Sequence, residues 1–109
     1  MTVRFGFVGF DHWYNAFPSL EAVLQDSEAE VVAIAHRDVA QAAHVSNKYG
    51  MPCGQSYAEV IERDDVDVVC SFASTEQNAA LAIRALEAGK SVALSPRGHL
   101  PQPASSLVA

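Results

Sequence analysis

The chain has 109 residues, half of them hydrophobic and 18% charged, a composition typical of one globular domain rather than a disordered or fibrous protein. Its net charge of −6 argues against a nucleic-acid surface, because the seven basic residues are scattered. No apolar run approaches membrane-spanning length. The first predicted strand starts at Thr2 or Val3, so we expect no signal peptide and a cytoplasmic protein.

Short apolar runs of strand length alternate with segments that carry apolar residues at helical spacing. In chain order they predict strand 3–10, helix 15–26, strand 30–36, helix 38–50, strand 51–54, helix 56–63, strand 66–73, helix 74–90 and strand 91–95. Strands that read as continuous apolar runs between helices indicate a parallel sheet covered on both faces. Right-handed crossovers then predict a doubly wound, Rossmann-like α/β fold with strand order 3-2-1-4-5.

The predicted helix boundaries rest on capping residues. Asp38 is expected to cap the second helix and Gly50 to end it. Ser56 begins the third helix in a capping box with Glu59. Gly89 ends the fourth helix.

Helical spacing also predicts core residues. In the first and last helices these are Phe17, Leu20, Val23 and Leu24, and Leu81, Ile83 and Leu86. Pro18 is expected in the first turn of its helix, where its missing N–H does no harm. Cys70 lies in an apolar strand and is interpreted as a small buried hydrophobe, while Cys53 follows a proline near a turn. The two cysteines form neither a disulfide framework nor a zinc motif.

The predicted domain covers residues 1–98, and residues 99–109 are expected to form an irregular tail. Pro101 and Pro103 exclude regular helix in this last segment. Four histidines occur, but they lie on separate elements without the paired spacing of a zinc motif, and we predict no metal site.

The turn after the first strand begins like a dinucleotide fingerprint and then departs from it. Gly9 is the first glycine of the G-x-G-x-x-G pattern, but Asp11 and Tyr14 occupy the positions of the other two. A carboxylate at residue 11 would repel a phosphate. Trp13 and Tyr14 could stack on a nucleotide ring, and we favour the interpretation that they fill the cofactor's space or pack beneath the helix.

Several stretches of the chain resemble one enzyme family. "VRFGFVGF", "AEVVAIAHRDVAQAAHVSNKYGMP" and, most specifically, "ALEAGK" followed by an apolar strand are similar to the N-terminal domain of the glucose–fructose oxidoreductase / inositol dehydrogenase / MocA family. The resemblance covers residues 3–98. It implies a domain that binds NAD or NADP and belongs to a two-domain oxidoreductase of sugars and related alcohols, whose second domain this sequence lacks.

The resemblance implies a set of cofactor-binding residues at the ends of the first, second and fourth strands: Gly9, Phe10, Asp11, His12, His36, Arg37, Ser74 and Thr75. Where the family commonly has an acidic residue for the ribose hydroxyls, this chain has His36 followed by Arg37. This pair either holds the 2′-phosphate of NADP, which favours NADP over NAD, or is a solvated pair at a strand end. Ser74 is also an ordinary N-cap.

Two further positions lack groups that the family uses in catalysis. Pro96 occupies the position of the family's proton-transferring lysine, and Asn78 stands where a histidine often lies near the nicotinamide. We therefore predict no catalytic residue and no turnover by the chain alone, with any enzyme activity left open.

The leading hypothesis is an NAD(P)-binding oxidoreductase domain in which cofactor binding is either retained or lost. The alternative is a degenerate domain that binds no dinucleotide and acts as a dimerising or accessory protein-interaction module. An uncovered sheet edge at the fifth strand would favour a homodimer in either case.

Overall fold

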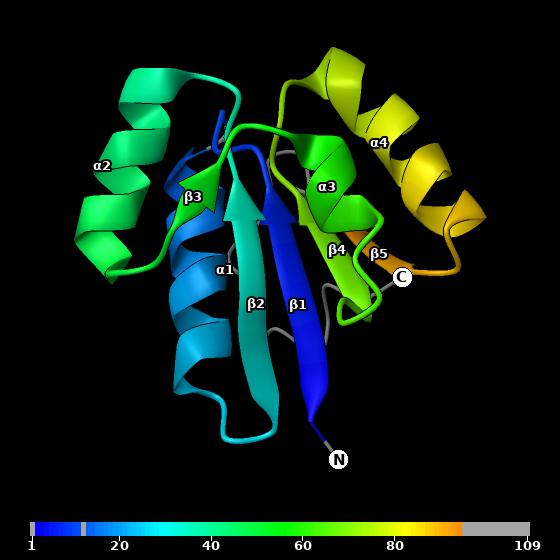
Figure 1. Ribbon diagram of the computed structural model, residues 1–109, viewed down its shortest axis with the longest axis horizontal. Helices are drawn as coiled ribbons and strands as arrows, with labels where there is room; N and C mark the ends of the chain where they lie inside the picture. Colours follow the sequence, from blue (N-terminus) through cyan, green and yellow to red (C-terminus); the bar gives the residue numbers. More distant parts are fainter. Residues whose placement is uncertain (1, 12, 95–109) are drawn as a thin grey trace.

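One parallel sheet of five strands forms the centre of the protein (Figure 1). The computed structural model describes residues 2–11 and 13–94, and only the backbone of residues 15, 75 and 94. The strands are β1 (Val3–Val8), β2 (Ala29–Ala35), β3 (Cys53–Gly54), β4 (Val68–Ser71) and β5 (Ser91–Leu94). Their order is β3-β2-β1-β4-β5, which confirms the predicted doubly wound sheet. The domain boundary predicted at residue 98 and the tail at 99–109 lie outside the described residues.

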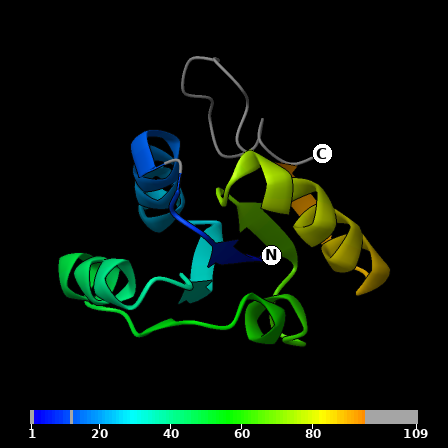
Figure 2. The same ribbon diagram turned by 90° about the horizontal axis from the view of Figure 1, so that it is seen from above.

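Four helices cover the two faces of this sheet. They are α1 (Trp13–Gln25), α2 (Val39–Tyr49), α3 (Tyr57–Ile61) and α4 (Thr75–Glu87). Helices α1 and α2 lie on one face and α3 and α4 on the other (Figure 2). The chain adds strands outward from β1 to β3 and then returns to pair β4 with β1, so right-handed crossovers place the later helices on the opposite face.

Each face of the sheet has its own apolar core. Beneath α1 and α2, Phe7 and Phe72 stack with ring centroids 6.1 Å apart, and both are fully buried with Leu20. On the other face, Val69 and Ile61 are part of the smaller cluster. The predicted burial of Cys70 is confirmed.

The predicted caps explain where the helices begin and end. Asp38 accepts a hydrogen bond from the Gln41 N–H at 3.0 Å, and Gly50 ends α2 with a left-handed φ of 66°. Ser56 accepts from the Glu59 N–H at the start of α3. These three capping residues are confirmed.

Three predictions about helix residues are wrong. Helix α1 begins at Trp13, so Pro18 is in its second turn and not its first. Leu24 lies on the solvent side and is 46% exposed. In α4, Ile83 and Leu86 are exposed, because Ala85 faces the sheet and each residue rotates by about 100° around the helix. The face of α4 that packs on the sheet carries Leu81, Ala82 and Ala85.

Polar contacts close the amino ends of the central strands. The Arg4 guanidinium binds the Asp67 carboxylate, and the Arg4 N–H also donates to it at 2.9 Å. Lys90, the lysine of the "ALEAGK" stretch, donates to the carbonyl oxygens of Arg63 and Val66 in the loop before β4. This lysine therefore fixes a loop at the edge of the sheet opposite the carboxyl ends.

Gly9 connects three strands at their carboxyl ends. Its N–H donates to the Ala35 carbonyl oxygen at 2.8 Å, so it is tied to the end of β2. Its φ is +81°, and a Cβ at this position would lie 2.7–2.8 Å from the backbone and Cβ of Ala73, just after β4. Both the turn and the approach to β4 therefore require glycine.

We predict that Gly9→Ala destabilises the fold more than Gly89→Ala. Gly89 has the same φ of +81° but nothing within 4 Å of its would-be Cβ. Its substitution therefore measures the cost of the left-handed backbone conformation alone. We expect a loss of about 1–2 kcal/mol in the free energy of unfolding at Gly89. At Gly9 the contact with Ala73 raises the expected loss to roughly 2–4 kcal/mol. Urea unfolding of both variants measures the difference, and equal losses would contradict the close approach.

Candidate functional site

An open pocket lies at the carboxyl edge of the sheet, at the upper end of the strands in Figure 1. In a doubly wound sheet, ligands bind at this edge, where the strand order reverses between β1 and β4. The pocket has a volume of about 330 Å³. Its lining comes from the turns after β1 and β2 and from the first turns of the helices that follow them: Phe10, Asp11, Trp13, His36, Arg37, Asp38 and Gln41.

Two buried rings join these turns. Phe10 is 4% exposed and His36 is 6% exposed, with ring centroids 6.0 Å apart. Phe10 also stacks on Phe17 of α1 at 5.7 Å. Phe10 therefore belongs to the core as well as to the pocket, and its burial holds the β1 turn against the β2 turn.

A hydrogen-bond network holds the turn after β2. The His36 N–H donates to the Gly54 carbonyl oxygen at 2.9 Å. The Tyr57 hydroxyl accepts from the Arg37 N–H at 3.2 Å and lies 3.4 Å from the Nδ1 of His36. The Asp38 N–H points at the same Nδ1, also at 3.4 Å. Residues of β3 and α3 therefore fix the backbone that carries His36 and Arg37.

The charge of His36 follows from its burial. Removal from water lowers the pKa of its imidazole below the ordinary value, and the nearby carboxylates of Asp11 and Asp38 offset this only in part. The ring is therefore neutral at pH 7. Of the predicted basic pair, Arg37 alone carries a positive charge.

Arg37 differs from the other arginines of residues 2–94. Three of them pair with carboxylates: Arg4 with Asp67, Arg63 with Asp65 and Arg84 with Glu62. Within the described part of the chain, the Arg37 guanidinium forms no ion pair or hydrogen bond. It is exposed and lines the pocket, so it is available to an anionic ligand.

The predicted residues after β4 lie beside this pocket without lining it. The Ser74 hydroxyl caps α4 by accepting from the Gln77 N–H at 3.3 Å. The fully buried Ser71 hydroxyl donates to Asn78 Oδ1 at 2.6 Å, so Asn78 serves the packing of α4 on β4. The contact between Gly9 and Ala73 brings this loop next to the pocket. His12, Pro96 and the side chain of Thr75 lie outside the described residues.

Trp13 and Tyr14 do not pack beneath α1, so that part of the interpretation is wrong. Their side chains are 61% and 57% exposed, and their rings contact each other edge to face at 5.9 Å. Ala16 and Leu20 face the core instead. Because α1 begins at residue 13, these two aromatic residues point away from the sheet, and Trp13 lies at the rim of the pocket.

The sequence prediction missed three residues of the site. Asp38 and Gln41 line the pocket, and the signal was their place in the first turn of the helix that follows the His-Arg pair. Tyr57 was missed because it belongs to α3, on the far face of the sheet. Its position three residues after the third strand, whose carboxyl end meets the same edge, was the available signal.

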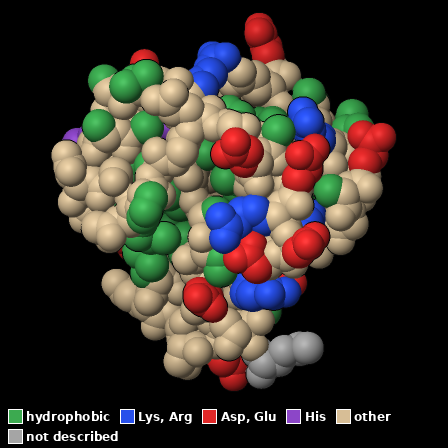
Figure 3. Space-filling view, viewed as in Figure 1, with side chains coloured by type: hydrophobic (Ala, Val, Ile, Leu, Met, Phe, Trp, Pro, Cys, Tyr) green, Lys and Arg blue, Asp and Glu red, His purple; other side chains and the backbone are tan. Residues whose placement is uncertain are grey.

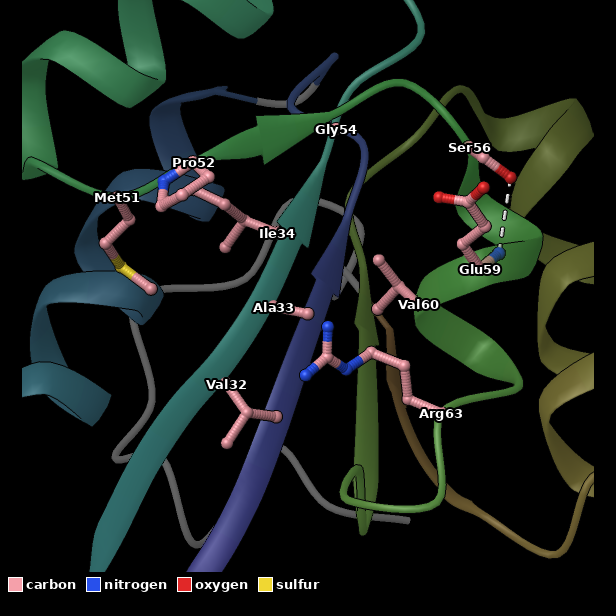
Figure 4. A pocket seen from close by; sticks show the side chains of 10 residues that line it. All are labelled: Val32, Ala33, Ile34, Met51, Pro52, Gly54, Ser56, Glu59, Val60 and Arg63. Atoms are coloured by element: carbon pink, nitrogen blue, oxygen red, sulfur yellow. Dashed lines mark hydrogen bonds between the residues drawn. The ribbon is translucent and has the colours of Figure 1, made fainter.

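A second hollow, of about 340 Å³, lies on the face of the sheet that α3 covers, between β2, β3 and α3 (Figure 4). Its apolar lining residues are Val32, Ala33, Ile34, Met51, Pro52 and Val60. Arg63 reaches over it in Figure 4, but its guanidinium is paired with Asp65. Acidic and basic side chains are interspersed over this face, without a large patch of one sign (Figure 3). The hollow therefore carries no converging reactive groups.

The described residues contain neither a metal cluster nor a membrane-spanning helix. No three His, Cys, Asp or Glu side chains among residues 2–11 and 13–94 converge to hold a metal ion. No helix in the same residues is long and apolar enough to cross a membrane.

Comparison with known proteins places this geometry in a family. Residues 3–95 match the model described as "Oxidoreductase family, NAD-binding Rossmann fold". The chain is 32% identical over 93 residues to trans-1,2-dihydrobenzene-1,2-diol dehydrogenase of Bos taurus, which covers 84% of this chain and 28% of that protein.

Two solved structures are similar over the same region. Biliverdin reductase from Synechocystis sp. PCC 6803, in complex with biliverdin and NADP+, superposes with a TM-score of 0.79 at 29% identity. The superposed region covers 86% of this chain and 29% of the biliverdin reductase chain. A 3-ketoreductase from Actinomadura kijaniata, in complex with TDP-benzene and NADP, gives a TM-score of 0.73 at 32% identity, with 86% and 29% covered. The chain spans less than a third of the length of the curated relatives it matches.

We predict that the stability of the protein falls as the pH is lowered from 7 to 5, and that His36 causes part of this fall. The folded-state pKa of His36 is below its unfolded value of 6.5, so the unfolded chain binds more protons between those two values. The free energy of unfolding therefore rises with pH through this window, and the contribution of His36 to it is lost as the pH drops. His36→Gln should reduce the difference between urea unfolding at pH 7 and at pH 5.

Asp65 and Asp67 do not contribute to the change in stability between pH 7 and pH 5. Their arginine partners hold the pKa of each carboxyl below the ordinary 3.8, so their contribution to stability is lost only at more acidic pH. An equal pH dependence in the wild type and in His36→Gln would contradict the neutral, buried imidazole.

Proposed function

The chain belongs to the GFO_IDH_MocA family of oxidoreductases with an NAD-binding Rossmann fold, and on this premise we propose that its carboxyl-edge pocket binds a nicotinamide dinucleotide and prefers NADP to NAD. The observation that carries the preference is the guanidinium of Arg37 at the pocket, which has no ion-pair partner among the described residues. Solved structures of two similar proteins hold NADP, which supports the class of ligand.

The pyrophosphate would lie at the start of α1. This helix has 13 residues and no acidic residue in its first turn, so the positive end of its dipole favours an anion. Gly9 supplies the tight turn that leads into it. Asp11 opposes binding through charge repulsion, but its side chain is exposed and water screens much of that effect. We therefore expect weakened binding rather than none.

The ribose end of the adenosine would lie against the turn after β2. Arg37 there offers planar N–H donors to a 2′-phosphate, and the neutral His36 ring offers one further N–H. An acidic residue at the position of His36 would hold the two ribose hydroxyls of NAD and repel a phosphate. This chain has the opposite arrangement, which supports NADP.

We propose that the chain by itself binds the cofactor without turnover, drawing on the cytoplasmic pool. Pro96 has no ionisable group, so the position that resembles the family's lysine cannot transfer a proton. The lining of the pocket accounts for a cofactor and carries no group that identifies a substrate.

The first test is a titration monitored by the fluorescence of Trp13, the only tryptophan, which lies at the rim of the pocket. We expect the emission to change with NADPH at a lower concentration than with NADH. Arg37→Ala should weaken NADPH binding roughly tenfold or more, because a charge-assisted contact to phosphate is lost, and leave NADH binding nearly unchanged.

Arg84→Ala is the matched control. It removes the same charge from an exposed ion pair on α4, outside the pocket. Its NADPH affinity should equal that of the wild type. If both variants lose affinity alike, the effect is one of net charge and not of a phosphate contact. If neither dinucleotide changes the emission or binds by calorimetry, the proposed binding function is wrong.

A second candidate function, self-association, is favoured by the edge of the sheet at β5. Among the described strands, β5 pairs with β4 alone. Ile83 and Leu86 on α4 are 59% and 62% exposed. Arg84 reaches Glu62 at the end of α3, so Leu86, about 200° further around the helix, lies on the flank of α4 that faces away from α3, toward β5. Ile83 lies nearly opposite the buried Ala85 and points to solvent. An open strand beside apolar side chains is a surface that a second copy can cover.

We predict that the protein is a dimer in solution and that Ile83→Asp with Leu86→Asp makes it monomeric. Buried carboxylates at the interface would lack partners and oppose association. Light scattering over a concentration series measures the mass. Leu24→Asp, which changes an exposed leucine on the other face, should keep the wild-type mass. A wild-type monomer at all concentrations would exclude this candidate.

A further inference from the structure

The hydroxyl of Tyr57 connects the far face of the sheet to the two residues proposed to select the cofactor. Tyr57 is the first residue of α3, which packs on the face opposite α1 and α2. Its side chain nevertheless reaches the turn after β2, where it accepts from the Arg37 N–H and lies 3.4 Å from His36 Nδ1. No lining residue of the pocket comes from α3, so Tyr57 acts from behind the site.

The hydrogen bonds determine which nitrogen of His36 carries the proton. The Asp38 N–H can only donate, and it points at Nδ1, so Nδ1 is an acceptor. The neutral ring then carries its proton on Nε2. The Tyr57 oxygen already accepts from the Arg37 N–H, which leaves its own O–H to donate to Nδ1. Tyr57 thus favours the same tautomer and orders the backbone of the next residue.

Burial keeps this tyrosine in the form that the network needs. The Tyr57 side chain is half-buried, and loss of water raises the pKa of its phenol above the ordinary value. The hydroxyl therefore keeps its proton across the physiological pH range. The distances around His36 Nδ1 are long, at 3.4 Å each, so neither contact holds the ring alone.

We propose that Tyr57 is a positioning residue for cofactor selection: its hydroxyl holds His36 in the Nε2–H tautomer and fixes the Arg37 backbone, so that an imidazole N–H and the guanidinium together meet a 2′-phosphorylated ribose. This inference rests on the proposed binding of NADP. It adds a residue that touches no cofactor atom and acts through the two that do.

The test removes only the hydroxyl, with Tyr57→Phe. Tyr49→Phe is the matched control, because the Tyr49 hydroxyl is buried without a hydrogen-bond partner in the described structure and does not line the pocket. Two measurements are made on each protein. Nitrogen-15 NMR of the histidine ring reports the tautomer of His36, and calorimetry reports the dissociation constants of NADPH and NADH.

We expect the wild type and Tyr49→Phe to hold His36 as the Nε2–H tautomer, and Tyr57→Phe to show a mixture of both tautomers. The ratio of NADH to NADPH dissociation constants should fall roughly five- to tenfold in Tyr57→Phe alone. A merely structural role would weaken both cofactors equally and leave the ratio unchanged.

The outcomes separate the inference from the function on which it rests. If the wild type prefers NADPH but Tyr57→Phe keeps both the tautomer and the ratio, the positioning role is wrong and the proposed function stands. If the tautomer changes without the ratio, Tyr57 orders the ring but does not select the cofactor, and the inference is overturned. If the wild type binds neither dinucleotide, the proposed function fails together with the selection role, whatever the NMR shows.

Discussion

The close approach of Gly9 to Ala73 is the constraint on which the carboxyl edge depends. Any side chain at residue 9 would meet the backbone after β4 at less than 3 Å, so the turn after β1 and the turn after β4 stay in contact. The N–H of the same glycine is bound to the end of β2. Three turns are thereby held at one place, and the pocket is formed between two of them. The fingerprint glycine therefore has a packing role of its own, whether or not a cofactor binds.

Beyond this glycine, the site is supported by groups that face away from the ligand. Phe10 joins the β1 turn to the His36 ring through the core, and Tyr57 joins that ring to the opposite face of the sheet. Positive charge in the pocket lies on one side chain, because burial keeps His36 neutral while Arg37 is exposed and has no ion-pair partner among the described residues. The pocket is therefore lined by one cation, Arg37, and by the carboxylates of Asp11 and Asp38.

The sequence predicted the topology because strand runs, caps and crossover rules are local or follow from handedness. Asp38 and Gly50 behave as their residue types require, and the strand order follows once the runs are placed. The orientation of side chains was predicted less well. Ile83 and Leu86 fit a helical core pattern, but the face with Leu81, Ala82 and Ala85 is the one that packs on the sheet. Tyr57 could not be assigned to the site, since only the folded sheet brings the start of α3 to the end of β2.

Lys90 has a structural role, although the stretch that contains it carries the family resemblance. The "ALEAGK" stretch makes the family resemblance specific, yet its lysine anchors the loop carbonyls of Arg63 and Val66 at the amino edge of the sheet. These hydrogen bonds support the fold and do not depend on what the opposite edge binds. A chain can therefore remain recognisable as a relative while its cofactor turn drifts toward another specificity, or toward none. The lysine of the stretch that identifies the family and the residues that line the pocket thus lie at opposite edges of this sheet.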